Sequence, residues 1–116
     1  MKKRNLKDHN KNFSASQSKV MINILKLFQN NPIADGDILD NLGLFFTSKT
    51  LSRLLFLNEL YKMSLEVEGV IMEFGTRWGQ NLSIFNALRG IYEPYNIKRK
   101  IIGFDTFTGF PSTTKQ

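Results

Sequence analysis

The chain contains no cysteine and a single histidine, His9. Without thiol groups, disulfide bonds, thiolate zinc sites and cysteine nucleophiles are all excluded. The histidine lies in a basic tail, where it is a poor candidate for a general base. Apolar runs are also short, since none approaches the roughly 18 residues that cross a bilayer, and no signal peptide follows the basic N-terminus. These absences predict a cytoplasmic protein that does not bind a membrane.

Length and charge limit the domain organisation and the partners. A chain of 116 residues with 41% hydrophobic residues fits one small globular domain. The formal net charge is +6, and residues 1–12 carry five basic side chains against Asp8 alone. We expect residues 1–13 to be a disordered, solvated basic tail. The alternative is a non-catalytic module that binds nucleic acid through this tail and the basic residues 98–100, but no arginine–aromatic interleaving favours it.

Residues 14–66 are predicted to form a helical lead-in. Ser14 is a suitable N-cap, and apolar residues recur at helical spacing until Asn30, where an Asn-Asn-Pro sequence ends the pattern. Residues 33–46 contain an acidic turn signal and an apolar patch, which indicate a loop or a short helical piece. A second helix, with a broad leucine-rich face, is expected from residues 47–48 to about Ser64.

Residues 67–116 have the pattern of a truncated, cofactor-binding β-α-β half-unit. Two short apolar runs, at 70–72 and 101–104, flank a helical pattern over 79–89 that Gly90 would end. Strands that pair in parallel are usually covered on both faces and are therefore apolar along their whole length, as these runs are. We expect both faces of this sheet to be covered. The predicted fold class is therefore α/β, with N-terminal helices followed by part of a Rossmann-like parallel sheet. Glu73 and Asp105 follow the two runs, at the carboxyl ends where ligands bind.

The residues at these strand ends suit an adenosine-containing cofactor. Gly75 and Gly79 provide a bend where the backbone can approach a ligand without an intervening Cβ. Asp105 follows the neighbouring strand and can accept hydrogen bonds from the ribose hydroxyls. An acidic residue at a strand end is also a common turn or helix-cap residue, and this reading stays open for Asp105 and for Glu73.

Charge and spacing favour S-adenosylmethionine over NAD. A dinucleotide fingerprint needs glycine at its third place, which is Arg77 here. The carboxylate of Glu73 would repel a pyrophosphate, whereas it would attract the sulfonium and ammonium groups of S-adenosylmethionine. A P-loop is excluded, because no G-K-[ST] follows the glycines. A fragment of an NAD-dependent Rossmann enzyme remains the less favoured alternative.

Two blocks of this region resemble the macrocin O-methyltransferase family of class I S-adenosylmethionine-dependent methyltransferases. They are E-F-G-T-R-W-G at residues 73–79 and G-F-D-T-F-T-G-F-P at residues 103–111. The resemblance covers about residues 47–111. It implies that Glu73, Gly75 and Gly79 line the methionine end of the cofactor, and that Asp105 holds the ribose.

Neighbouring residues in the two blocks complete the set of cofactor-binding candidates: Thr76, Arg77 and Thr106. Arg77 and Trp78 would each either contact the ligand or shape the loop. Many relatives have a second glycine after the first block, where this chain has Gln80, so the start of the following helix can differ in detail.

The resemblance also implies what the chain leaves out. Members of the family have a considerably longer domain, whose catalytic residues and, in some members, magnesium-binding aspartates lie beyond the third strand. We therefore expect a truncated form that keeps part of the cofactor site, with no catalytic residue or metal ligand assigned. The intact enzyme would methylate a hydroxyl of a small molecule, such as a sugar. Because two strands alone are marginal, we expect the isolated chain to be inactive and either prone to aggregation or partly unfolded. A homo-oligomer stays open.

Overall fold

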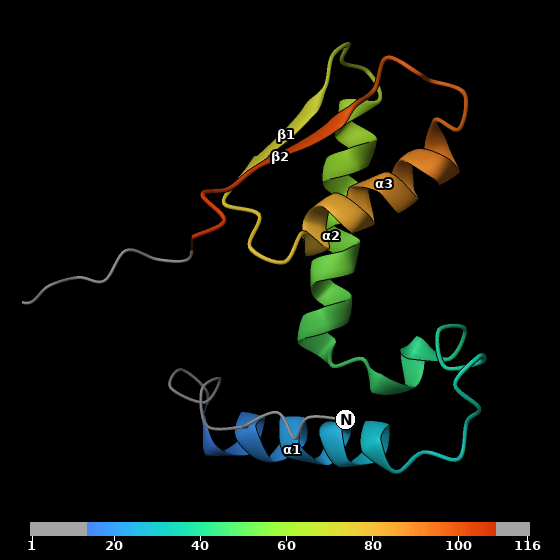
Figure 1. The fold of residues 1–116 in the computed structure, drawn as a ribbon, viewed down its shortest axis with the longest axis vertical. Coiled ribbons are helices and arrows are strands. Elements are labelled where there is room, and N and C mark those ends of the chain that lie inside the picture. The colour runs from blue at the N-terminus through green and yellow to red at the C-terminus, as the bar shows by residue number, and fades with distance from the viewer. Residues whose placement is uncertain (1–13, 109–116) are drawn as a thin grey trace, which may run out of the picture. The chain divides into compact units, whose positions relative to one another are not determined.

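A computed structural model describes residues 14–108 of the chain (Figure 1). The chain divides into two compact units, Met1–Thr47 and Ser48–Gln116. The first holds a helix and a short 3-10 helix, and the second holds a helix, a strand, a helix and a strand in that order. No helix within residues 14–108 has the length and hydropathy needed to cross a membrane. The basic tail predicted for residues 1–13 lies outside the described residues.

The first unit contains α1 (Ala15–Gln29) and the 3-10 helix η3 (Leu42–Phe45). Ser14 begins α1 through a capping box: its hydroxyl accepts the Gln17 N–H at 3.3 Å, and the Gln17 side chain accepts the Ser14 N–H at 3.1 Å. The helix stops before the Asn-Asn-Pro sequence. The predictions of this helix and of a short helical piece within residues 33–46 are therefore confirmed.

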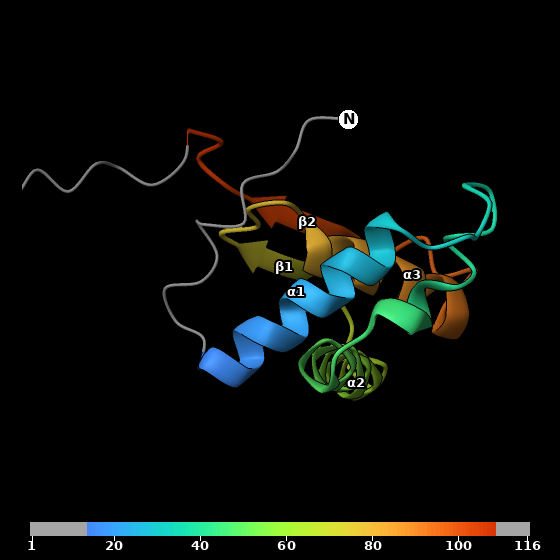
Figure 2. The ribbon, with the colours of Figure 1, turned by 90° about the horizontal axis from the view of Figure 1, so that it is seen from below.

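The second unit is a helix followed by a β-α-β unit. Its elements are α2 (Ser48–Ser64), β1 (Ile71–Phe74), α3 (Gln80–Tyr92) and β2 (Ile101–Phe104). The two strands are parallel, with Ile71 opposite Ile101 and Phe74 opposite Phe104. Figures 1 and 2 show α3 on one side of the strands, and α3 also contacts α2. The predicted α/β class and the parallel β-α-β unit are confirmed.

The two faces of this small sheet differ. On the face under α3, a Cβ added to Gly103 would lie 2.7 Å from Cγ2 of Thr76 and would also clash with Leu82, so the helix and the strand are in close contact there. On the other face, Phe74 and Phe104 stack with their ring centroids 4.9 Å apart, and Phe74 is 75% exposed. The expectation that both faces are covered is not met by the described residues of the second unit, because Met72 and Phe104 on this second face are also exposed.

The C-terminal end of α3 lies beyond the predicted stop at Gly90. The helix continues to Tyr92, and the N–H of Glu93 closes the last turn on the carbonyl of Arg89 at 2.8 Å. Tertiary contact explains the extension: Tyr92 stacks on Tyr61 of α2 with ring centroids 6.0 Å apart. An aromatic pair contributes about 0.5–1.5 kcal/mol, which is comparable with the cost of about 1 kcal/mol of a glycine inside a helix. The prediction of Gly90 as the residue that ends the helix is wrong.

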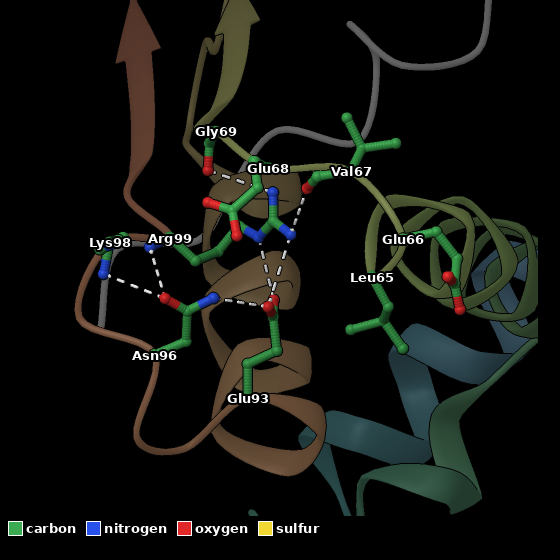
Figure 3. Close-up of a pocket in the computed structure, with 9 residues that line it drawn as sticks. All are labelled: Leu65, Glu66, Val67, Glu68, Gly69, Glu93, Asn96, Lys98 and Arg99. Carbon is green, nitrogen blue, oxygen red and sulfur yellow. Dashed lines mark hydrogen bonds and ion pairs between the residues drawn. The ribbon is translucent and has the colours of Figure 1, made fainter.

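A buried arginine fixes the ends of the strands opposite to the glycine bend. The guanidinium of Arg99 donates to the backbone carbonyls of Val67 and Gly69, at 2.7 and 3.1 Å (Figure 3). The same group donates to the carbonyl of Ser64, at 2.8 Å. It also forms an ion pair with Glu93, with 3.0 Å between Nε and Oε2. These contacts, which we call the Arg99 clamp, join the end of α2, the segment before β1 and the loop between α3 and β2.

The Arg99 clamp changes the interpretation of residues 98–100, which the sequence suggested as a basic surface for the nucleic-acid-binding alternative. Arg99 is only 4% exposed, so its charge is not available to a nucleic acid. Hydrogen bonds from Arg99 and then Tyr61 lower the pKa of Glu93 to about 2. Burial, followed by the 2.6 Å hydrogen bond that its hydroxyl donates to Glu93, raises the pKa of Tyr61 to about 12. Glu93 is therefore ionised and Tyr61 is neutral near pH 7. Both side chains hold the Arg99 clamp together.

Candidate cofactor site

A bend with three left-handed residues connects β1 to α3. Gly75, Arg77 and Gly79 have φ values of 80°, 51° and 73°. Glycine adopts this region without a steric cost, whereas Arg77 does so only because the surrounding contacts hold it there. The N–H of Gly75 continues the strand pairing to the carbonyl of Phe104 at 2.7 Å, and the N–H of Gly79 closes a turn on the carbonyl of Thr76 at 2.8 Å.

Asp105 follows β2 directly and faces this bend. Its Oδ2 accepts the backbone N–H of Arg77 at 2.8 Å, and its Oδ1 accepts the N–H of Phe107 at 3.0 Å. These backbone donors, Phe107 first and then Arg77, lower the pKa of the Asp105 carboxyl. The predicted meeting of this carboxylate with the 75–79 bend is confirmed. A carboxylate has about four lone-pair sites, so ribose hydroxyls can bond to Asp105 by replacing the lesser contacts from Thr106.

Glu73 lies within β1, opposite Gly103, and not after the end of the strand as the sequence suggested. Its Oε1 accepts the side-chain amide of Asn81 at 2.6 Å. Its Oε2 is buried and has no hydrogen-bond partner. A buried carboxylate oxygen without a partner is costly, so its presence at a strand end points to a ligand that would complete it.

An open cavity of about 250 Å³ lies beside the bend. Its lining residues come from α2, β1, the bend and the start of α3: Arg53, Glu73, Gly75, Thr76, Arg77, Trp78, Gln80 and Asn81. Four of the seven residues predicted from the sequence therefore line one cavity. Gly79 belongs to the same bend, and Asp105 is bonded to the backbone of Arg77. Thr106 is exposed next to Asp105 and is not among the lining residues.

The two threonines differ in what they can contribute. Thr76 is 9% exposed, and its methyl group lies against Gly103, so the side chain packs under the bend. Thr106 helps to lower the pKa of Asp105 through its backbone and side-chain hydrogen bonds. Both residues therefore act mainly on the shape of the site and on the orientation of the acid.

Four lining residues were not among the predicted site residues, namely Arg53, Trp78, Gln80 and Asn81, and a hydrogen bond links two of them. Arg53 lies on α2, and its Nη2 donates to Oδ1 of Asn81 at 2.7 Å. Asn81 in turn donates to Glu73, so the three side chains form one chain of hydrogen bonds across the cavity. Arg53 stands in a leucine-rich helix 20 residues before Glu73, and no local motif marks it. Asn81 follows the first sequence block, and its amide on the first turn of a helix was the only signal available.

The cavity carries charges of both signs. Glu73 contributes a carboxylate, and Arg53 and Arg77 contribute guanidinium groups. Gly79 is the N-cap of helix α3 and makes no side-chain cap hydrogen bond, so no side chain of this residue satisfies the first N–H groups of the helix. Within residues 14–108, no group of three or more His, Asp or Glu side chains could hold a metal ion. The magnesium that the family resemblance allows in longer members remains a prediction.

A parallel β-α-β unit whose glycine bend faces an acid on the next strand is a partial class I methyltransferase fold, and solved structures support this class. The crystal structure of CalS11, a calicheamicin methyltransferase, matches with a TM-score of 0.82 and 46% identity, over 88% of this chain and 40% of that chain. The apo structure of CalS11, described as a TDP-rhamnose 3'-O-methyltransferase of calicheamicin biosynthesis, matches with a TM-score of 0.81 and 46% identity, over 84% of this chain and 42% of that chain. No protein-family model and no curated protein matches this chain.

These similarities confirm the predicted partial methyltransferase fold. They do not specifically show the macrocin O-methyltransferase family, which stays an expectation from the sequence blocks. The chain spans about 40% of the length of the CalS11 chain in the first match. The activity and the substrate of a whole enzyme are therefore matters for a proposal.

Proposed function

We propose that the cavity beside the 75–79 bend is the S-adenosylmethionine site of an O-methyltransferase. The observation that carries the proposal is the meeting of the Asp105 carboxylate with the bend, 2.8 Å from the N–H of Arg77, beside a buried oxygen of Glu73 that has no partner. The 46% identity to CalS11 supports methyl transfer as the chemistry.

Each residue has a defined task in this proposal. Asp105 accepts hydrogen bonds from the ribose hydroxyls with the lone pairs that the backbone leaves free. Gly75 lets the cofactor approach the backbone, because no atom lies within 4 Å of the place of a Cβ there. Glu73 offers a negative charge to the cationic end of the cofactor. When bound, S-adenosylmethionine supplies an electrophilic methyl group, and alignment of an acceptor oxygen with it accelerates transfer.

We propose a hydroxyl of a small molecule, such as a sugar, as the methyl acceptor. The TDP-rhamnose 3'-O-methyltransferase activity given for CalS11 supports a sugar. No residue within 14–108 is assigned as the base that takes the proton of the hydroxyl, and the acceptor site is likewise unassigned. Membership of the macrocin O-methyltransferase family, with or without magnesium, is the finer form of the same proposal.

Two other functions are less favoured. The nucleic-acid-binding alternative needs exposed basic residues, and Arg99 is buried in the Arg99 clamp. One of its three charges at residues 98–100 is therefore not available to a nucleic acid. An NAD site would place a pyrophosphate beside the buried carboxylate of Glu73, whose free oxygen would repel it. The guanidinium of Arg77 in the same cavity lessens that repulsion, so binding must be measured with both ligands.

Calorimetric titration of the 116-residue chain with S-adenosylhomocysteine and with NAD tests the assignment. We expect heat of binding with S-adenosylhomocysteine and none with NAD. Asp105→Ala should abolish the binding, whereas Asp105→Asn, which keeps an acceptor oxygen for the N–H of Arg77, should weaken it by roughly 10-fold or more. Asp40→Ala, in an exposed turn of the first unit, is the matched control. Binding of NAD in preference, or unchanged binding by Asp105→Ala, would contradict the proposal.

A further inference from the structure

We propose that Arg77 and Trp78, at the tip of the 75–79 bend, bind the nucleotide diphosphate that carries the acceptor sugar. The inference rests on the proposed methyltransferase function and specifies its acceptor as a sugar linked to a nucleotide. The sequence left open whether these two residues contact a ligand or shape the loop, and the similarity to CalS11 assigns a role to neither.

The backbone at the tip of the bend is held on both sides. The N–H of Arg77 is bonded to Asp105 at 2.8 Å, and the N–H of Gly79 is bonded to the carbonyl of Thr76 at 2.8 Å. Arg77 has a φ of 51°, in a region that few residues other than glycine adopt. Backbone strain of this kind clusters at binding and catalytic sites, where a side chain must be presented in a fixed direction.

Trp78 offers a flat apolar face to a ligand. It is the single tryptophan of the chain, it lines the cavity, and it is 87% exposed. Among the described residues, its indole stacks on no other aromatic ring. An indole in water leaves a large apolar area unburied, and a partner ring would cover it. Nucleobases stack on aromatic side chains whatever the base, because every base has a π-face.

The guanidinium of Arg77 is available for an anion. It is exposed, and its side chain makes no ion pair or hydrogen bond within residues 14–108. Its planar fork of N–H donors matches the oxygens of a phosphate group. Arg53, the other arginine of the cavity, differs because its guanidinium already donates to Asn81. Residues 77 and 78 are adjacent, so a diphosphate and the base of one nucleotide can reach both side chains.

The charge of the loaded site also favours an anionic acceptor. The guanidinium groups of Arg53 and Arg77 balance the carboxylates of Glu73 and Asp105. S-adenosylmethionine carries a sulfonium and an ammonium against a single carboxylate, so the bound cofactor leaves a net positive charge. The chain as a whole has a formal net charge of +6. A positive field raises the local concentration of an anionic substrate, and a neutral free sugar would gain nothing from it.

Thymidine diphosphate is the probe, because it has a base and a diphosphate without the acceptor sugar. Calorimetric titration of the 116-residue chain, saturated with S-adenosylmethionine, would give its Kd. Quenching of tryptophan fluorescence would report the contact with Trp78 specifically, since the chain has no other tryptophan. We expect thymidine diphosphate to bind together with the cofactor and to quench the fluorescence.

Two variants and two matched controls test the contacts. Trp78→Ala removes the ring, and Arg77→Asn removes the guanidinium with a residue that tolerates a left-handed backbone. Tyr95→Ala and Lys98→Asn remove an exposed ring and an exposed positive charge from the loop between α3 and β2. All four residues are exposed, so we expect the variants to fold, and circular dichroism verifies this.

We expect Trp78→Ala to weaken thymidine diphosphate roughly 5- to 100-fold, as for the loss of one base–aromatic stack. Arg77→Asn should weaken it roughly 10-fold or more, as for the loss of a hydrogen bond to a charged group. Both variants should weaken thymidine diphosphate more than S-adenosylhomocysteine and so change the ratio of the two Kd values. The two controls should leave this ratio unchanged.

Several results would overturn the nucleotide subsite while the cofactor site stands. They are binding of S-adenosylhomocysteine without thymidine diphosphate, competition between the two ligands, or an unchanged ratio in both variants. An effect of Tyr95→Ala equal to that of Trp78→Ala would show stacking on any exposed ring, and would overturn it as well. If the parent chain binds no S-adenosylhomocysteine, the proposed function itself is overturned, and the subsite with it.

Discussion

Replacement of Arg99 by methionine should be among the most destabilising single changes in the second unit. Arg99→Met keeps an apolar stem of similar length and removes only the guanidinium. The carbonyls of Ser64, Val67 and Gly69 then lose their donor, and the carboxylate of Glu93 loses its counter-charge in a buried place. Loss of one partner of a buried ion pair costs about 3–5 kcal/mol.

This cost is large against the stability of a small protein. Domains unfold with about 5–15 kcal/mol in total, so Arg99→Met would remove roughly a fifth of it or more. In a domain of 60–100 residues each kcal/mol lowers Tm by about 4–8 °C, which gives a fall of at least roughly 12 °C. Urea unfolding followed by circular dichroism would give the difference from the shift in midpoint.

The adjacent Lys98 provides a matched control, because it belongs to the same basic run and is exposed. Lys98→Met should change the free energy of unfolding by less than about 0.5 kcal/mol. If Arg99→Met costs no more than about 1 kcal/mol above Lys98→Met, the guanidinium does not hold the segments together as the structure indicates. The inference that residues 98–100 contain one structural and not three surface charges would then fail.

Two further predictions concern the same unit. Because the pKa of Glu93 is lowered from 4.5 to about 2, its contribution to stability is complete above pH 4.5 and is lost as the pH falls toward 2. Urea unfolding across this window should show a loss of up to about 3 kcal/mol, and Arg99→Met should lose most of this acid dependence, since Arg99 is the main cause of the shift. Gly103→Val should cost roughly 1–3 kcal/mol, because its Cβ would lie 2.7 Å from the Thr76 methyl group under the bend. Gly36→Ala, with no atom within 4 Å of its Cβ, should be close to neutral, and equal effects of the two changes would refute the close contact.

The sequence predicted the parts of this fold that depend on local pattern. The capped start of α1, the parallel strands and the position of Asp105 follow from periodicity and from the rule that parallel strands end at one edge. The end of α3 did not follow, because Gly90 is a local stop signal and the extension depends on Tyr92 reaching Tyr61. Tertiary contact overrides local propensity at such places.

Side chains that act across long sequence separations could not be predicted. A Lys-Arg-Lys run is usually solvated, and the burial of Arg99 depends on carbonyls 30 to 35 residues away. Arg53 is similar, since its partner Asn81 lies 28 residues further along the chain. Both are arginines whose long side chains cross between elements. The tertiary arrangement, and not the local sequence, decides which charged side chains are buried or bonded across elements.

The two ends of the strands have different roles. The Arg99 clamp lies at their starts, and the 75–79 bend and Asp105 lie at their carboxyl ends. A two-stranded sheet is marginal by itself, and here one face with Phe74 and Phe104 is exposed. Its register is therefore not secured by the size of the sheet. The Arg99 clamp fixes the starts of both strands, and the N–H of Ile71 bonds to the carbonyl of Lys100 at 2.9 Å. A slip of one residue at this end would turn the side chain of Glu73 to the opposite face and take it away from Asn81. The geometry of the proposed cofactor site thus depends on a buried ion pair at the far end of the strands. If the proposal holds, Arg99→Met should weaken S-adenosylhomocysteine binding even under conditions where the chain remains folded.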